Sequence, residues 1–154
     1  MATVSPPWAY TLQLPRDPRA PGVARSTLRH VLDVHRIKEL TDTAELLASE
    51  LVTNAYQHSD GPYTLRIRAF GPYRLRVGVW DGNPEIPPPF NGAAPPVPAE
   101  SGGLTGGLSE SGRGLQLVRL CADDWGAYRL GGGGKLLWVE CVRQEPEPPG
   151  AGAA

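Results

Sequence analysis

Cysteine is scarce in this sequence, and the cysteines present form no recognisable metal or redox motif. The chain of 154 residues contains only Cys121 and Cys141, without CxxC spacing and without a histidine at metal-ligand distance. Their spacing argues against a structural zinc site and against a disulfide framework. Both side chains are predicted to be reduced thiols, buried or half-buried, and a disulfide between them is the less favoured alternative.

Long apolar runs and an excess of positive charge are also absent. No apolar stretch approaches the roughly 18 residues of a membrane span, and residues 1–14 lack the basic start and apolar run of a signal peptide. The formal net charge is -1, so no overall positive field attracts nucleic acid or anionic lipid. These absences predict a cytoplasmic protein that binds neither nucleic acid nor membrane. Lysine occurs only at Lys38 and Lys135, a skew towards arginine that indicates a GC-rich, bacterial genome.

Glycine and proline, by contrast, are abundant and concentrated in two stretches. Residues 82–114 hold eight glycines and seven prolines, and the end of the chain reads EPEPPGAGAA. The first stretch predicts a long mobile lid, residues 82–111, and the second a disordered tail over residues 144–154. With a disordered start over residues 1–7, one domain remains, residues 8–143, which is long enough to bury a core.

The spacing of apolar residues predicts the order strand, two helices, two strands, helix, two strands. Thr41 is expected to cap the second helix, and Gly71 with Pro72 to form a tight turn between the strands of a hairpin. This order predicts an α/β two-layer sandwich with helices on one face of a mixed, largely antiparallel sheet. The expected elements cover residues 8–14, 24–36, 41–58, 63–70, 73–80, 114–121, 125–130 and 135–142.

Arginines alternate with apolar residues along the predicted hairpin. They occupy every second position, so one face of the hairpin is apolar and the other is rich in arginine. The favoured interpretation is the wet face of a one-sided sheet, and the alternative is a surface for an acidic partner. The arginines are Arg66, Arg68, Arg74 and Arg76.

The second predicted helix carries Glu50, Asn54 and His58 at four-residue spacing, which places them in one line on the helix. Leu47 falls on the same face, so the polar line emerges from the side that meets the core. Ionised glutamate is seldom buried without a partner, so the line is predicted to border a polar pocket. The alternative is a surface helix whose charges fall at this spacing by chance.

Two further sites flank the predicted lid. Asp81 ends an apolar strand, where its carboxylate can accept a hydrogen bond from an exocyclic amine such as that of adenine. Gly112-Arg113-Gly114 opens a helix, where free backbone N–H groups and the positive end of the helix dipole favour phosphate. Alone, this motif is an ordinary helix start. The combination of this motif and Asp81 with the polar line of the second predicted helix is much more specific.

The motif ExxxNAxxH on a helix, the strand-ending aspartate and SGxGL after the lid resemble the GHKL superfamily of gyrase, heat-shock chaperone, histidine kinase and mismatch-repair ATPases. The resemblance covers residues 8–141, and within the superfamily the chain is most similar to bacterial anti-sigma-factor serine/threonine kinases. It implies the GHKL (Bergerat) ATP-binding sandwich, with ATP and Mg²⁺ as cofactors. It also implies that Glu50 is the catalytic base and that Asn54 is the metal ligand. The nucleotide contacts implied are Asn54, Asp81, Gly82, Gly112, Arg113, Gly114 and Leu115.

Three positions depart from the pattern of these relatives. The family's DxGxG is replaced here by a sequence with Asn83 and Glu85 at the glycine positions, and Glu110 stands where the serine kinases tend to carry an arginine. Asn83 is expected to tolerate a left-handed backbone, whereas Glu85 adds bulk and negative charge. His58 matches the end of the helix motif, with packing at the helix end as an equally favoured role.

The function implied is an ATP-dependent serine/threonine protein kinase that binds a sigma factor and phosphorylates an antagonist protein. The alternative is a non-catalytic, nucleotide-gated protein-binding module, in which ATP orders the lid and thereby a partner surface. Intact Glu50 favours the kinase, and the altered glycine positions favour the module. A homodimer is an open alternative for the assembly.

Overall fold

The computed structural model describes residues 7–71, 73–92 and 110–144, with backbone alone for residues 110–114. Most of the predicted N-terminal extension and tail, and residues 93–109 of the predicted lid, lie outside these ranges. Within them, no helix has the length and apolar composition that a membrane span requires.

The centre of the fold is a sheet of five strands in the order β1-β2-β3-β5-β4. All four neighbouring pairs are antiparallel, so the expected mixture of parallel and antiparallel pairs was wrong. The reason is the position of β5. Strands β3 and β4 run in the same direction, but β5 lies between them and pairs antiparallel with both. The strands are β1 (Trp8–Leu14), β2 (Tyr63–Phe70), β3 (Arg74–Asp81), β4 (Asp124–Leu130) and β5 (Gly134–Val142).

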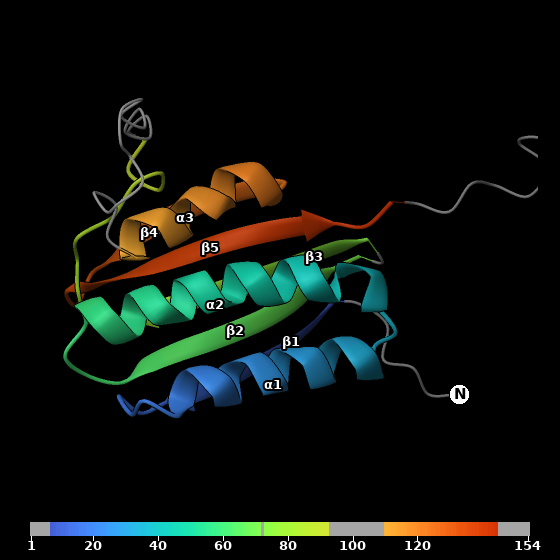
Figure 1. The fold of residues 1–154 in the computed structure, drawn as a ribbon, viewed down its shortest axis with the longest axis horizontal. Coiled ribbons are helices and arrows are strands. Elements are labelled where there is room, and N and C mark those ends of the chain that lie inside the picture. Colours follow the sequence, from blue (N-terminus) through green and yellow to red (C-terminus); the bar gives the residue numbers. More distant parts are fainter. Residues whose placement is uncertain (1–6, 72, 93–109, 145–154) are drawn as a thin grey trace, which may run out of the picture.

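Three α-helices cover one face of the sheet, with α2 (Thr41–His58) lying between α1 (Ala20–Val34) and α3 (Glu110–Cys121) (Figure 1). This is the predicted two-layer sandwich. The start of α1 and the capping residue of α2 differ from the prediction. Helix α1 begins at Ala20 rather than Ala24, because Pro21 fits the first turn, where no backbone N–H is needed. Helix α2 is preceded by the short 3₁₀ helix η1 (Lys38–Leu40), so Leu40 and not Thr41 occupies the N-cap.

One hydrophobic core fills the space between the helices and the sheet. The helices contribute residues at three- and four-residue spacing, and the strands contribute every second residue. Cys141 belongs to this core and Cys121 is half-buried; both are free thiols, as predicted. Burial raises the pKa of Cys141 to about 12, so it stays protonated. The least exposed aliphatic side chains are Leu28, Leu32, Leu47, Leu51, Leu65, Val77 and Val139.

The closest backbone approach in the sheet lies where β3 ends beside the start of β5. A Cβ atom added to Gly134 would lie 2.3 Å from the carbonyl oxygen of Asp81. Real Cβ atoms do not approach a backbone oxygen this closely, so only glycine fits without moving one strand. Gly134 therefore sets how near Lys135, the next residue, comes to Asp81.

We expect Gly134→Ala to lower the free energy of unfolding by about 1–3 kcal/mol, because the added methyl group overpacks a rigid backbone contact. Gly131→Ala is the matched control, since its added Cβ meets nothing within 4 Å. The control should change stability by less than about 0.5 kcal/mol. Urea denaturation of both variants measures the difference, and equal midpoints would contradict the proposed close approach.

Candidate functional site

A polar cavity lies at the carboxyl end of α2, where β3 ends and β5 begins. It holds about 210 Å³, which is below the roughly 300–1,000 Å³ typical of a complete ligand pocket. The chain brings α2, the segment after β3 and β5 together here. The lining residues are Asn54, His58, Asn83, Glu85, Pro87 and Lys135.

Asn54 contributes a buried acceptor without a partner. Asn54 is only 5 % exposed. Its side-chain oxygen Oδ1 is buried and accepts no hydrogen bond from any described residue. Most buried polar atoms in proteins are paired, because an unpaired one costs about 1–3 kcal/mol. An oxygen left in this state on the wall of a polar cavity is suited to a cation or a hydrogen-bond donor that enters the cavity. The predicted metal ligand is therefore chemically free to act as one.

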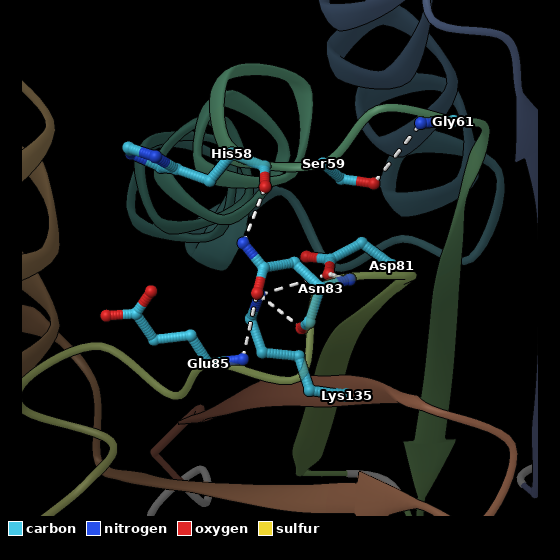
Figure 2. A network of polar contacts seen from close by, with 7 residues as sticks. All are labelled: His58, Ser59, Gly61, Asp81, Asn83, Glu85 and Lys135. Carbon is cyan, nitrogen blue, oxygen red and sulfur yellow. Dashed lines mark hydrogen bonds and ion pairs between the residues drawn. The ribbon is translucent and has the colours of Figure 1, made fainter.

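Asp81 and Lys135 form a buried ion pair at the base of the cavity. They are direct partners across β3 and β5, and Lys135 Nζ lies 3.0 Å from Asp81 Oδ1. The same ammonium group donates to the carbonyl oxygen of Asn83 at 3.0 Å (Figure 2). The lysine is 1 % exposed, which is tolerated because its charge is paired and hydrogen-bonded. Of the two partners, Lys135 lines the cavity, whereas the Asp81 side chain lies behind it and is 2% exposed.

The sequence analysis did not identify Lys135, although the sequence contains a weak signal for it. Lys135 occupies the same strand face as Leu137, Val139 and Cys141, all of which are buried. A lysine at a core-facing position needs a buried acid as its partner. Finding that partner requires the register between β3 and β5, which the sequence alone does not provide.

Asn83 holds the turn after β3 by hydrogen bonds, not by a left-handed backbone. Its backbone N–H donates to Asp81 Oδ1 at 2.8 Å, and its Oδ1 accepts from the backbone N–H of Glu85 at 2.9 Å. Among the described non-glycine residues only Arg36 has a positive φ, so Asn83 does not adopt the left-handed backbone that it would tolerate. Asn83 therefore fixes the turn on both sides, by its backbone N–H towards Asp81 and by its side chain towards Glu85.

Asn83 also ties this turn to α2. Its Nδ2 donates to the carbonyl oxygen of His58 at 2.6 Å (Figure 2), one of the last carbonyls of the helix, which have no partner within it. The ring of His58 is exposed and lines the cavity, so the backbone of His58, not its ring, makes the contact at the helix end. The end of β3, the turn and the end of α2 are thus fixed relative to one another.

Glu50 lies one helical turn before Asn54 on the same face of α2. It is half-buried, and the loss of solvent around its carboxylate raises its pKa above the ordinary value. No hydrogen bond or ion pair joins it to another described residue, and it lies outside the cavity lining. Of the predicted polar line, the structure therefore brings Asn54 and His58 into the cavity and leaves Glu50 beside it.

Helix α3 contains the predicted phosphate-loop glycines in its first turns. The helix begins at Glu110, whereas the sequence predicted a start at Gly114 after a loop. By helix geometry the N–H groups of residues 110–112, which include Gly112, have no partner within the helix, and the N–H of Arg113 is the first that donates within it. Those of Gly114 and Leu115 fall within the hydrogen-bonded part of the helix, and Leu115 is buried in the core. Only the first part of the predicted motif therefore presents free donors.

The start of α3 and the end of α2 lie at the same end of the sandwich (Figure 1). The positive end of the α3 dipole thus lies on the side of the molecule that holds Asn54 and the Asp81–Lys135 pair. The arrangement combines an unpaired amide oxygen, a carboxylate oxygen and a helix N-terminus. These are the groups that can hold a cation, an amine and a phosphate, respectively.

The predicted lid is partly anchored. Residues 82–92 form no helix or strand, but Phe90 is buried in the core and Ile86 packs against it. The expectation that this composition supports no packing was therefore wrong for the first part of the stretch, because large apolar residues interrupt the prolines and glycines. The predicted end at residue 111 lies inside α3.

Comparison with known proteins gives two matches. The family model described as a histidine kinase-like ATPase domain matches residues 14–141. An uncharacterized protein of Streptomyces coelicolor is 34% identical over 105 residues, which cover 66% of this chain and 84% of the relative. The matched family range includes every residue of the site described above.

We expect Lys135→Met to lower the free energy of unfolding by about 3–5 kcal/mol, because it leaves the buried Asp81 carboxylate unpaired. The only other lysine provides a matched control: Lys38 forms an exposed pair with Asp33, and Lys38→Met should cost less than about 1 kcal/mol. Denaturant titration at neutral pH measures both. Adding Asp81→Asn to Lys135→Met should recover part of the loss; similar losses for the two lysines would contradict the buried pair.

Proposed function

The chain belongs to the histidine kinase-like ATPase domain family, and on this basis we propose that it binds ATP with Mg²⁺ and transfers phosphate to a serine or threonine of a partner protein. ATP binding follows from the family. The transfer to a hydroxyl group is the finer proposal, and it is supported by the resemblance to anti-sigma-factor kinases and by the half-buried Glu50. The proposed partners are a sigma factor and the antagonist protein that becomes phosphorylated.

The observation that carries the proposal is the unpaired, buried Oδ1 of Asn54. An amide oxygen is the hard ligand that Mg²⁺ accepts, and Mg²⁺ commonly takes only one or two protein ligands beside phosphate oxygens and water. The described residues contain no group of three His, Cys, Asp or Glu side chains arranged for a metal. A single-ligand site at Asn54 is consistent with both facts. When bound, Mg²⁺ would neutralise phosphate charge.

The base and phosphates of ATP have separate candidate partners. The Asp81 carboxylate can accept the exocyclic amine of adenine, with Gly82 adjoining it, while the ion pair with Lys135 holds Asp81 in place. The first N–H groups of α3, including that of Gly112, can donate to phosphate oxygens, with Arg113 adjoining them. These assignments orient the nucleotide along the line from β3 to α3.

Glu50 is the proposed general base. Partial burial raises the pKa of its carboxylate, which makes it a stronger proton acceptor at the pH at which it is still ionised. In the transfer it accepts the proton of the attacking hydroxyl group while the hydroxyl oxygen bonds to the γ-phosphorus and ADP leaves. Phosphoryl transfer asks the protein mainly for alignment and charge stabilisation, so one base and fixed donors suffice.

Two observations favour the second candidate, a nucleotide-gated binding module without transfer. Glu85 lines the cavity, and Asp81 is already paired with Lys135. Each feature reduces the positive potential in the site, which would stabilise the charge of the phosphate group during transfer. Binding of the nucleotide without transfer depends less on this potential. The two candidates share the ATP site and differ only in the requirement for Glu50.

We expect Mg²⁺-dependent ATP binding in calorimetry, and Asn54→Ala should abolish the Mg²⁺ dependence or the binding itself. Asn54→Asp keeps an oxygen ligand and should retain the dependence. The control is Gln57→Ala, which removes an exposed amide from the same helix and should leave binding unchanged. Absence of heat with wild-type protein at millimolar ATP would contradict the proposal at its base.

Glu50→Gln should preserve ATP affinity and lower phosphate transfer to a partner protein about 10²-fold or more, because only the basic carboxylate is lost. In the wild type, the rate should fall as the pH drops through the raised pKa of Glu50, above the ordinary value of 4.5. Glu45→Gln is the control on the same helix, since Glu45 pairs with Arg29 at the surface. A protein that binds ATP, captures its partner and never labels it would refute the kinase and leave the binding module.

A further inference from the structure

The face of the sheet that carries no described helix is rich in arginine and tryptophan. Alternation along β2 and β3 sends Leu65, Val77 and Val79 to the core and the hairpin arginines to the opposite face. We call this opposite side the open face. It does not overlap the cavity at Asn54, because the sheet lies between them.

The arginines of the open face are not all neutralised. Arg74 and Arg76 both pair with Glu140, the partner of Arg76 across β3 and β5. Arg66 and Arg68 form no ion pair with any described residue. They lie over aromatic rings instead, with the guanidinium carbon of Arg68 4.2 Å from the ring centre of Phe70. Local positive charge therefore remains along β2, although the whole chain carries a net charge of -1.

A small hollow lies among these arginines, and glycines allow the ring of Trp138 to lie against the sheet. A Cβ atom at Gly126 would come within 2.5 Å of the indole, so the ring lies directly on that glycine. Arg76 covers the ring from a distance of 3.9 Å. The hollow has room for about 40 Å³, which fits a carboxylate but not an aromatic ring. It is lined by Arg66, Arg68, Arg76, Trp80, Leu136 and Trp138, together with Gly78.

Two residues that line this hollow each carry a buried, unused donor. Arg66 Nε and Trp138 Nε1 are both buried and donate to no described residue. Trp138 is 8 % exposed, so its N–H has little access to solvent. Burial and the neighbouring charges of Arg66 and Arg76 also lower the pKa of Arg68, as expected where like charges are crowded. A negatively charged acceptor in the hollow would relieve the crowding of these positive charges.

We propose that the open face binds an acidic segment of a partner protein, with one carboxylate side chain of that segment entering the hollow between Arg66 and Trp138. Tyr128 and Leu130 of β4 extend the same face and are exposed, at 58% and 37%. They provide apolar surface for a large side chain next to the carboxylate. Aromatic residues and arginine are the side chains that most often dominate protein interfaces.

A second copy of the chain fits this face poorly. A two-fold interface would bring each open face against itself, and the unpaired arginines of both copies would then repel one another. Nucleic acid also fits poorly, because Glu140 and Asp124 lie side by side on the open face across β5 and β4. Two carboxylates there would oppose a continuous row of phosphates, whereas a protein segment with one local acidic group avoids them.

The four tryptophan indoles provide an internal assay by nuclear magnetic resonance of ¹⁵N-labelled full-length protein. Trp80 and Trp138 line the hollow, while Trp8 and Trp125 pack on the helix side of the sheet. Titration with a capped Glu-Leu-Glu peptide should shift the indole signals of Trp80 and Trp138 in a saturable way and leave those of Trp8 and Trp125 in place. The uncharged Gln-Leu-Gln peptide should cause no shift.

Variants identify the groups responsible. Arg66→Gln with Arg68→Gln should weaken the peptide about tenfold or more, the effect of losing charge-assisted hydrogen bonds. Arg66→Lys keeps the charge but loses the Nε donor, so its affinity for the peptide should lie between those of the wild type and the double variant. Arg129→Gln, on the same sheet but on its other face, should have no effect on peptide affinity. Unchanged Trp8 and Trp125 signals verify that each variant is folded.

Several results would overturn the proposal. These are no shift with the peptide, an equal shift with inorganic phosphate or oligodeoxythymidylate, and concentration-dependent shifts of the protein alone that indicate self-association. ATP is absent from the titration, so the outcome does not depend on the proposed nucleotide site.

Discussion

The buried pair of Asp81 and Lys135 is the interaction on which the site depends. It joins the end of β3 to the start of β5 at the position where Gly134 allows the backbones to approach. Asn83 extends the pair by accepting from Lys135 and donating to the last turn of α2. Sheet, turn and helix are thereby held in one hydrogen-bonded unit. A buried pair of this kind contributes little net stability by itself, but loss of either partner leaves an uncompensated charge, so it fixes one arrangement.

Against this fixed background, the groups proposed to do the chemistry are poorly satisfied. Asn54 has an unpaired buried oxygen, and Glu50 is half-buried without a partner. Both lower the stability of the free protein, since burial favours paired or neutral groups. The raised pKa means that the fold favours the protonated form of Glu50. The destabilisation by Glu50 is therefore absent at low pH and develops as the pH rises through that pKa. Unsatisfied groups next to a satisfied network are typical of a site arranged for a ligand.

The alternation and spacing of apolar residues predicted the strands within one residue at each end and placed α2 correctly. The errors occurred where backbone chemistry or distant pairing decides the structure. Helix α1 begins four residues before its predicted start because Pro21 fits its first turn, and Asn83 holds its turn by hydrogen bonds, a role that the sequence did not indicate. Lys135 was missed because its partner is identified only by the register of β3 with β5. The resemblance to GHKL ATPases indicated the family, which the comparison confirmed, yet it could not reveal this pair.

The two proposed binding regions share strands but use opposite faces. Along β3, Trp80 points to the open face and the next residue, Asp81, to the cavity side; along β5, Lys135 and Leu136 divide in the same way. A shift of one residue in either strand would exchange these sets, burying arginines and exposing the ion pair. Strand register therefore determines both regions at once. Substitutions confined to one face can alter its ligand without removing a contact from the other, which makes the two regions separable by mutation.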